Sequence, residues 1–337
     1  MNLKFPSRTD KAFIPGILKT GMLPVFFLTA LLFLSCQAFA DWSPIIDRLV
    51  ADGFDEPVIR ELFSRPEVKF DAGPMSSKLQ ELLKNPFKKP AALPSYNPKR
   101  VYKGLLKEKM ITQARSYLQE NTDLLENISS HYCVPKEIVV SILLVETRLG
   151  EHVGGKYAFN SLASMALCTD LETIRPYLPK RLINKKNEDY AGTICRQKAD
   201  WAYSELKALI NYAQVSWFDP LALPGSIYGA IGLCQFLPSN VFSYGVDGDH
   251  DGRIDLFAKA DALYSIANYL QEHGWNCTMD KPGAVRVIFD YNRSSVYVNT
   301  VLAVAEKLKD KSRIKQGIRF PSPSAQAGKG QVPNPST

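Results

Sequence analysis

The chain has 337 residues, of which 45% are hydrophobic and 22% are charged, and its formal net charge is +7. This composition is typical of a globular protein and excludes a disordered, collagen-like or polytopic membrane chain. The 41 Lys and Arg residues are interspersed with 34 Asp and Glu residues, so no concentrated basic stripe indicates a nucleic-acid partner. A weakly basic surface fits an anionic polymer or the cell envelope better.

The N-terminus has the pattern of an export signal. Basic residues precede an apolar run at residues 23–34, and Ala38-Phe39-Ala40 follows as a small-x-small cleavage site. The run is shorter than the roughly 20 residues that cross a membrane. We therefore predict that residues 1–40 are a signal peptide and that the protein is exported to the periplasm. The alternative is a lipid anchor at Cys36, which follows Phe33-Leu34-Ser35.

Helical periodicity dominates the rest of the chain. An N-terminal helical region is predicted at residues 41–100, where Ser43-Pro44 and Asp55-Glu56-Pro57 start helices and a Pro-rich basic segment crosses to the main domain. The main domain is predicted at residues 101–312, and residues 313–337 have the composition of a disordered tail. Strands are expected to be scarce. Further helices are predicted at residues 102–120, 124–129, 138–149, 200–212, 261–273, 284–291 and 295–309.

Five cysteines remain after signal cleavage, and their spacing fits no zinc site. Cys168 and Cys195 bracket a polar segment that looks like an excursion from the core. We predict a disulfide between these two residues, which an exported protein permits. The alternative is that all five cysteines are small buried apolar residues without a bridge.

Glu146 is the first candidate for chemistry. It ends a nearly all-apolar helix, where a charge is costly unless it is used or paired. Burial raises the pKa of a carboxyl group, and such a group can keep a proton near neutral pH and act as a general acid. The alternative is a salt-bridged glutamate at the edge of the core.

A glycine-rich segment at residues 225–239 is the second candidate. Its small residues allow close backbone approach, either to another helix or to a ligand. Ser226 and Gln235 are polar groups in this apolar surrounding. A tight packing corner explains the segment equally well.

The third candidate is an acidic loop. Asp247, Asp249 and Asp251 with Gly252 reproduce the first half of an EF-hand loop, which binds Ca²⁺ through oxygen ligands. Position 12 of the loop is Ala258 and not the usual Glu. Asp255 or Asp261 must therefore supply the last carboxylate. A single loop favours a structural ion over a switch, and a solvated acidic turn is the alternative.

These segments, in this order, resemble the catalytic domain of the membrane-bound lytic transglycosylase B family, which has a lysozyme-like, mainly α fold with some β structure. The resemblance also rests on residues 267–275 and on Tyr291-Asn292-Arg293-Ser294-Ser295, and it extends over most of residues 42–308. It implies a helical catalytic domain that carries an EF-hand-like calcium loop and an N-terminal helical extension. Members of this family also carry a paired arginine that helps to bind the glycan or peptide, and no such pair is visible after Met165 in this chain.

The resemblance implies cleavage of the β-1,4 bond between N-acetylmuramic acid and N-acetylglucosamine in peptidoglycan without water. Glu146 falls on the family's single catalytic glutamate, which protonates the glycosidic oxygen and then removes the proton of the muramoyl 6-hydroxyl, leaving a 1,6-anhydro end. The substrate-binding positions matched are Ser226, Gln235, Tyr291 and Asn292. The calcium positions matched are Asp247, Asp249, Asp251, Arg253 and Asp261, so the resemblance implies one structural Ca²⁺.

Two other functions stay open. A hydrolytic muramidase would need a second carboxylate that activates water. A peptidoglycan-binding scaffold for envelope-assembly partners would keep the fold without turnover. The expected partner in every case is the peptidoglycan glycan strand.

Overall fold

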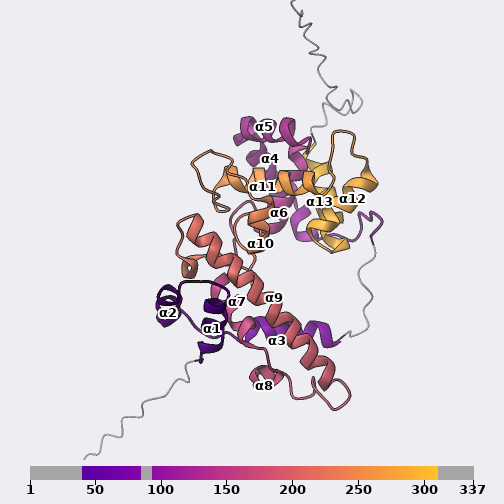
Figure 1. Cartoon of the computed structure of the whole chain (residues 1–337). Helices are drawn as coiled ribbons and strands as arrows, with labels where there is room; N and C mark the ends of the chain where they lie inside the picture. Colours follow the sequence, from indigo (N-terminus) through magenta and orange to yellow (C-terminus); the bar gives the residue numbers. More distant parts are fainter. Residues whose placement is uncertain (1–39, 85–92, 310–337) are drawn as a thin grey trace, which may run out of the picture. The chain divides into compact units, whose positions relative to one another are not determined.

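The computed structural model describes residues 40–84 and 93–309 (Figure 1). The predicted signal peptide, apart from its last residue, lies outside these residues, as do Cys36 and the predicted tail. The described chain is mainly helical, as predicted, and has only two short strands. Among the described residues, no single helix is both long and apolar enough to cross a membrane. The helices at Thr122–Tyr132 and Lys136–Thr147 are long and apolar enough only when taken together, and the chain bends by 111° between them.

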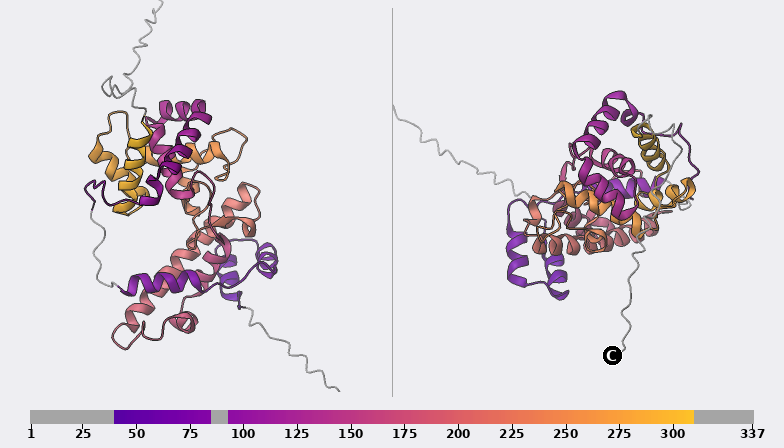
Figure 2. Two further views of the ribbon diagram at one scale, coloured as in Figure 1. Left: turned by 180° about the vertical axis from the view of Figure 1, so that it is seen from behind. Right: turned by 90° about the horizontal axis from the view of Figure 1, so that it is seen from above.

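Three helices form the N-terminal region: α1 (Ser43–Ala51), α2 (Glu56–Ser64) and α3 (Gly73–Lys84). The Asp55 side chain caps α2 by accepting a hydrogen bond from the backbone N–H of Val58, as its position before the helix predicts. The sequence analysis did not predict α3. Helix α1 packs against α7 (Ala158–Leu167), and α3 packs against both α7 and α9 (Glu188–Val215). Figure 2 shows α3 running beside α9.

The next elements lead to the most apolar helix. They are the 3₁₀ turn η1 (Lys103–Leu106), α4 (Glu108–Glu120), α5 (Thr122–Tyr132) and α6 (Lys136–Thr147). All residues of α6 from Ile138 to Leu144 are buried. The helix ends where Arg148, Leu149 and Gly150 take positive φ angles of 52°, 64° and 98°, conformations that no α-helix continues.

The segment predicted as an excursion is largely helical. It contains α8 (Leu171–Ile174), the 3₁₀ turn η2 (Arg175–Tyr177) and the first part of α9 (Glu188–Val215), which begins well before the predicted start at Asp200. Small buried side chains at Ala191, Cys195 and Ala199, four residues apart, form one face of α9. Helix α7 (Ala158–Leu167) packs along α9. It was missed because eight of its ten residues are buried, so the sequence shows no polar face.

Three C-terminal helices follow the predictions closely: α11 (Lys259–Glu272), α12 (Lys281–Tyr291) and α13 (Ser295–Leu308). The 3₁₀ turn η3 (Pro220–Ala222) and the helix α10 (Pro238–Tyr244) were not predicted. Helix α13 packs on α6, and α11 packs on α5 and α6. The strands β1 (Lys156–Tyr157) and β2 (Pro224–Gly225) pair antiparallel.

The predicted disulfide is wrong. The structure joins Cys133 to Cys277, whose Cα atoms are 4.8 Å apart, and leaves Cys168, Cys195 and Cys234 as buried free thiols. The Cys195 thiol donates to the backbone carbonyl of Cys168 at 3.0 Å instead of bonding to its sulfur. Because Cys133 and Cys277 are 144 residues apart, only the packing of α5 beside α11 brings them together.

Candidate active site

Glu146 lies in the last turn of α6, where the apolar helix reaches the surface of the core. Its neighbour Thr147 is fully buried and donates a hydrogen bond to the backbone carbonyl of Leu233 at 3.1 Å. This contact ties the end of α6 to the glycine-rich segment. The Glu146 side chain itself is half-buried, so its carboxyl group is surrounded by protein but can still be reached.

Burial is the dominant influence on the carboxyl group. It raises the pKa of Glu146 from the ordinary 4.5 to about 7, and the hydroxyl of Tyr297 on α13 lowers it in part. No ion pair of Glu146 is present among the described residues, which argues against the salt-bridged alternative. Near neutral pH the group therefore holds a proton for a large share of the time, as a general acid requires.

Tyr297 is a site residue that the sequence analysis missed. Its phenol is buried, and within the described chain its oxygen meets no partner with full hydrogen-bond geometry, although it is close enough to Glu146 to affect that carboxyl group. Its ring stacks against Tyr291 with 6.3 Å between the centroids. No sequence signal separates Tyr297 from the other apolar residues of its helix.

A cavity of about 640 Å³ opens beside Glu146. It is lined by η1, the start of α4 and the end of α6, including Tyr102, Lys107 and Arg148. Glu146 is the one carboxylate among the described residues that line it. The four predicted substrate-binding residues are not part of this lining. Of the four, Tyr291 is close enough to Glu146 to interact with it electrostatically.

Ser226 and Gln235 stand at the two ends of the glycine-rich loop. The Ser226 hydroxyl oxygen accepts hydrogen bonds from the backbone N–H groups of Tyr228 and Ala230, and its own proton stays available. The Gln235 amide donates to the carbonyls of Val153 and Gly232 at 3.1 and 3.0 Å. This leaves the Gln235 side-chain oxygen free to accept.

The path of the glycine-rich loop requires a glycine at position 232. Gly232 has φ +71°, and a Cβ there would lie 2.6 Å from the Leu256 carbonyl oxygen. No larger residue fits that approach without moving the backbone. The structure thus supports the tight packing corner. The approach of this segment to a ligand stays a prediction.

Tyr291 and Asn292 lie at the end of α12. The Tyr291 hydroxyl donates to the Cys234 carbonyl at 2.7 Å, which joins α12 to the glycine-rich loop. Burial, together with the nearby Cys234 and Glu146, raises the pKa of Tyr291 well above its ordinary value, so the phenol stays neutral. Asn292 is exposed. The structure thus brings Tyr291 close to Glu146, with Asn292 at the adjoining surface.

The acidic loop gathers three of its predicted ligands. Oxygen atoms of Asp247, Asp249 and Asp261 all lie within 4.8 Å of one another. Asp251 instead bonds to Arg253, by both the backbone N–H at 3.0 Å and the side chain at 3.1 Å. An all-carboxylate cluster is the type of donor set that Ca²⁺ prefers.

Asp261 is the most constrained member of this cluster. It is 1% exposed and accepts hydrogen bonds from the backbone N–H groups of Gly248 and Asp255 at 2.8 and 2.6 Å. Burial raises its pKa, these hydrogen bonds lower it, and the charges of Asp247 and Asp249 raise it again. A divalent ion would offset this repulsion. Asp255 is not in the cluster, because its carboxylate caps the turn before α11 through Phe257.

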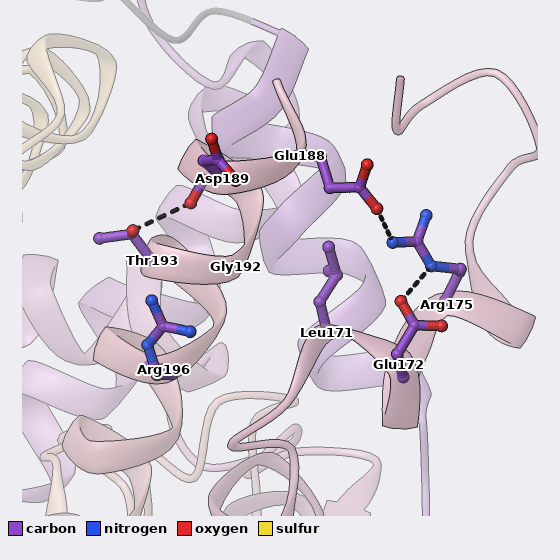
Figure 3. A pocket seen from close by; sticks show the side chains of 8 residues that line it. All are labelled: Leu171, Glu172, Arg175, Glu188, Asp189, Gly192, Thr193 and Arg196. Carbon is purple, nitrogen blue, oxygen red and sulfur yellow. Dashed lines mark hydrogen bonds and ion pairs between the residues drawn. The ribbon is translucent and has the colours of Figure 1, made fainter. Parts of the chain in front are cut away.

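A smaller cavity of about 260 Å³ lies between α8 and the start of α9 (Figure 3). It contains none of the predicted site residues. Arg175 at its edge bonds to Glu172 and Glu188, so this arginine is engaged within the cavity wall.

The chain is similar to known proteins in sequence and in fold. Residues 38–285 match the family described as the transglycosylase SLT domain. A curated relative, membrane-bound lytic murein transglycosylase B of Escherichia coli strain K12, is 29% identical over 235 residues. The match covers 68% of this chain and 56% of that protein, so the chain spans about half the length of this relative.

Solved structures share the fold. The Escherichia coli lytic transglycosylase Slt35 in complex with calcium aligns with a TM-score of 0.59 at 22% identity, over 79% of this chain and 92% of that chain. SltB3 of Pseudomonas aeruginosa in complex with NAG-NAM-pentapeptide aligns with a TM-score of 0.57 at 21% identity, over 84% and 81% of the two chains. At these identities the likeness supports the mainly helical, lysozyme-like fold.

Proposed function

The chain belongs to the transglycosylase SLT domain family, and on that premise we propose that it is an exported peptidoglycan lytic transglycosylase. It would cleave the β-1,4 bond between N-acetylmuramic acid and N-acetylglucosamine and leave a 1,6-anhydro end. The observation that carries the proposal is Glu146, a half-buried carboxyl group with a pKa raised to about 7, beside a cavity of about 640 Å³. The calcium-bound and peptidoglycan-ligand-bound relatives support it.

Glu146 would act twice in this reaction. Its carboxylic acid donates a proton to the glycosidic oxygen as the bond between this oxygen and C1 of N-acetylmuramic acid breaks. The resulting carboxylate then takes the proton of the C6 hydroxyl of the same N-acetylmuramic acid, while the C6 oxygen forms the new bond to C1. The carboxyl group is thereby reprotonated, and no water is consumed.

The surroundings of Glu146 favour this route over hydrolysis. Most glycosidases use a pair of carboxylates across the scissile bond. The described lining of the cavity contains one carboxylate, that of Glu146. A muramidase that activates water with a second carboxylate is therefore the less supported alternative.

The four predicted substrate contacts have atoms to offer to a glycan. The Ser226 hydroxyl proton and the Gln235 side-chain oxygen are free because the bonds described above use their other atoms. Asn292 is exposed at the end of α12. Tyr291 would form a wall of the site, since its hydroxyl is held by Cys234. We propose that these residues bind the sugars on either side of the cleaved bond.

A structural Ca²⁺ would be held by Asp247, Asp249 and Asp261, with Asp251 and Arg253 completing the loop that encloses it. The ion would neutralise the acidic cluster and fix the start of α11. It takes no part in the bond cleavage. Export to the periplasm, by the signal peptide at residues 1–40, would bring the enzyme to its substrate.

Mass spectrometry of the products tests the reaction. Residues 41–337 are incubated with purified sacculi beside two variants, Glu146→Gln and the exposed control Glu151→Gln. Muropeptides ending in 1,6-anhydromuramic acid are expected from the parent and the control but not from Glu146→Gln. Reducing ends would indicate a muramidase. Sacculus binding without any product would indicate a scaffold, and cleavage at the parental rate by Glu146→Gln would refute the role of this residue.

A further inference from the structure

The segment that leads from η2 into α9 carries a dense group of positive charges. Lys180, Arg181, Lys185 and Lys186 lie within seven residues, and all four are exposed. We call residues 179–187 the basic loop. None of these residues lines the cavity beside Glu146 or the smaller cavity at α8. The basic loop is therefore a surface feature that the proposed function does not use.

The basic loop lies at the end of α9 that is remote from Glu146. It leads from the region of α8 into the first turn of α9 (Figure 1), a helix of 28 residues that is about 42 Å long at 1.5 Å per residue. Near the other end of α9, the backbone N–H of Leu256 donates to the Tyr212 hydroxyl, and the Leu256 carbonyl accepts from Leu233. The Leu233 carbonyl accepts in turn from Thr147, the neighbour of Glu146. Most of the length of α9 thus separates the basic loop from Glu146.

The backbone of the basic loop is fixed by its own asparagine side chains. The N–H of Asn184 donates to the side-chain oxygen of Asn187 at 2.8 Å, and the N–H of Lys186 donates to that of Asn184 at 2.9 Å. The Asn187 amide donates to the Leu182 carbonyl at 2.9 Å. Leu182 and Ile183 are partly buried against the core. The apolar side chains of the loop therefore face the protein, while its cations stay in contact with solvent.

The four cations of the basic loop have no partner in the part of the chain that the structure describes. None of them makes an ion pair or a side-chain hydrogen bond there. The nearby carboxylates of Glu172 and Glu188 both bind Arg175 (Figure 3). Asp189 adds one negative charge against the four positive ones. Because like charges this close repel one another, an anionic surface placed against the loop would be attracted to it.

Two exposed tyrosines flank the basic loop. Tyr177 is 54% exposed and Tyr190 is 40% exposed. The ring of Tyr177 packs against Phe70, with 5.8 Å between the centroids, so its position is fixed although much of it meets solvent. Tyrosine has an apolar ring and a polar hydroxyl, and it is enriched where a membrane meets water. Lysine and arginine beside it bind the headgroups of anionic lipids. Cations alone would suit any anionic polymer, and their combination with tyrosines favours a lipid surface.

We propose that the basic loop, together with Tyr177 and Tyr190, docks the protein on the surface of a membrane that contains anionic phospholipids. The cations pair with headgroup phosphates, and the two rings enter the headgroup layer. This docking is separate from a lipid group at Cys36, which would anchor the N-terminus. It also goes beyond the proposed cleavage, because the loop lines no part of the cavity beside Glu146. A docked protein would hold Glu146 away from the bilayer by most of the length of α9.

Co-sedimentation with lipid vesicles measures this docking. The protein is residues 41–337, which lack Cys36, so no lipid group contributes to binding. Its partition coefficient is measured for phosphatidylcholine vesicles with about a quarter of phosphatidylglycerol, and for vesicles of phosphatidylcholine alone. Binding to purified sacculi is measured beside them. The test variant carries Lys180→Gln, Arg181→Gln, Lys185→Gln and Lys186→Gln.

The matched control removes the same charge from exposed side chains that make no bond within the described chain and lie outside both cavities. It carries Lys99→Gln, Arg100→Gln, Lys103→Gln and Lys307→Gln. Both variants should keep the Tm of the parent, because only solvent-exposed side chains without partners are changed. Any difference in vesicle binding between them then reports where the charges lie and not how many there are.

We expect the basic-loop variant to bind the anionic vesicles at least about tenfold more weakly than the parent at low salt, since each Lys or Arg near such a surface strengthens binding about fivefold. The control should stay within about twofold of the parent, and high salt should weaken the parent as the substitutions do. Equal binding by parent and variant, or no preference of the parent for anionic vesicles, would overturn the inference. A loss of sacculus binding alone would assign the loop to an anionic polymer and would also overturn it. Failure of the proposed function is seen separately, as the absence of muropeptides from the parent.

Discussion

The substitution Glu146→Gln should make the protein more stable at alkaline pH, even though it removes the proposed acid. Burial raises the pKa of Glu146 from 4.5 to about 7 in the native state, so folding opposes its ionisation. Between these two values the unfolded chain has lost the proton and the native protein retains it, so stability falls as pH rises. Below pH 4.5 the group is protonated in both states and costs nothing.

The size of the effect follows from the pKa difference. Each tenfold change in proton affinity corresponds to about 1.4 kcal/mol, which gives a destabilisation of about 3 kcal/mol once the pH is above both values. Because the side chain is only half-buried, solvent reduces this figure, and we expect about 2 kcal/mol. Glutamine has nearly the same shape and cannot ionise, so it removes this cost.

Urea unfolding of parent and variant at pH 4.5 and pH 8.5 measures the effect. The difference in unfolding free energy should be near zero at the lower pH and about 2 kcal/mol in favour of Glu146→Gln at the higher pH. The exposed control Glu151→Gln should show no such change between the two pH values. A difference for Glu146→Gln that does not vary with pH would refute the view that the carboxyl group is desolvated, and with it the physical basis for a general acid.

Three further changes test other parts of the structure. Tyr297→Phe removes the hydroxyl that lowers the pKa of Glu146, so this pKa should rise. The alkaline limb of the pH profile of kcat/KM should then move to higher pH, and an unmoved limb would contradict the interaction between Tyr297 and Glu146. Asp261→Asn should abolish the rise in Tm that Ca²⁺ produces in chelator-treated parent protein, and a rise of parental size would exclude this ligand. Replacing Cys133 and Cys277 by Ser should lower the free energy of unfolding by about 2 to 5 kcal/mol, and an unchanged value would argue against the bridge.

Several features could be predicted because they depend on neighbours in sequence. Helix α6 was predicted from its apolar residues, although it ends at Thr147, two residues before the predicted end at Leu149. The start of α2 was predicted from Asp55-Glu56-Pro57. The acidic loop was found because three aspartates alternate within five residues. Glu146 stood out since a carboxylate in an apolar helix is costly wherever the helix packs. In each case the physical constraint acts over a single helix turn or loop.

Other features depended on contacts between distant segments, which local patterns do not contain. Helix α7 has no polar face, so only its burial beside α9 distinguishes it from a strand or a loop. The Cys133 to Cys277 bridge crosses 144 residues, while the closer pair in sequence stays reduced. The approach of Tyr297 to Glu146 and the gathering of Lys107 with Arg148 arise when α13 and α4 pack on α6. The sequence by itself thus determined the proposed acid, Glu146, and the acidic loop. The tertiary structure decided what surrounds Glu146, because burial and charge at a site come from every segment that packs there.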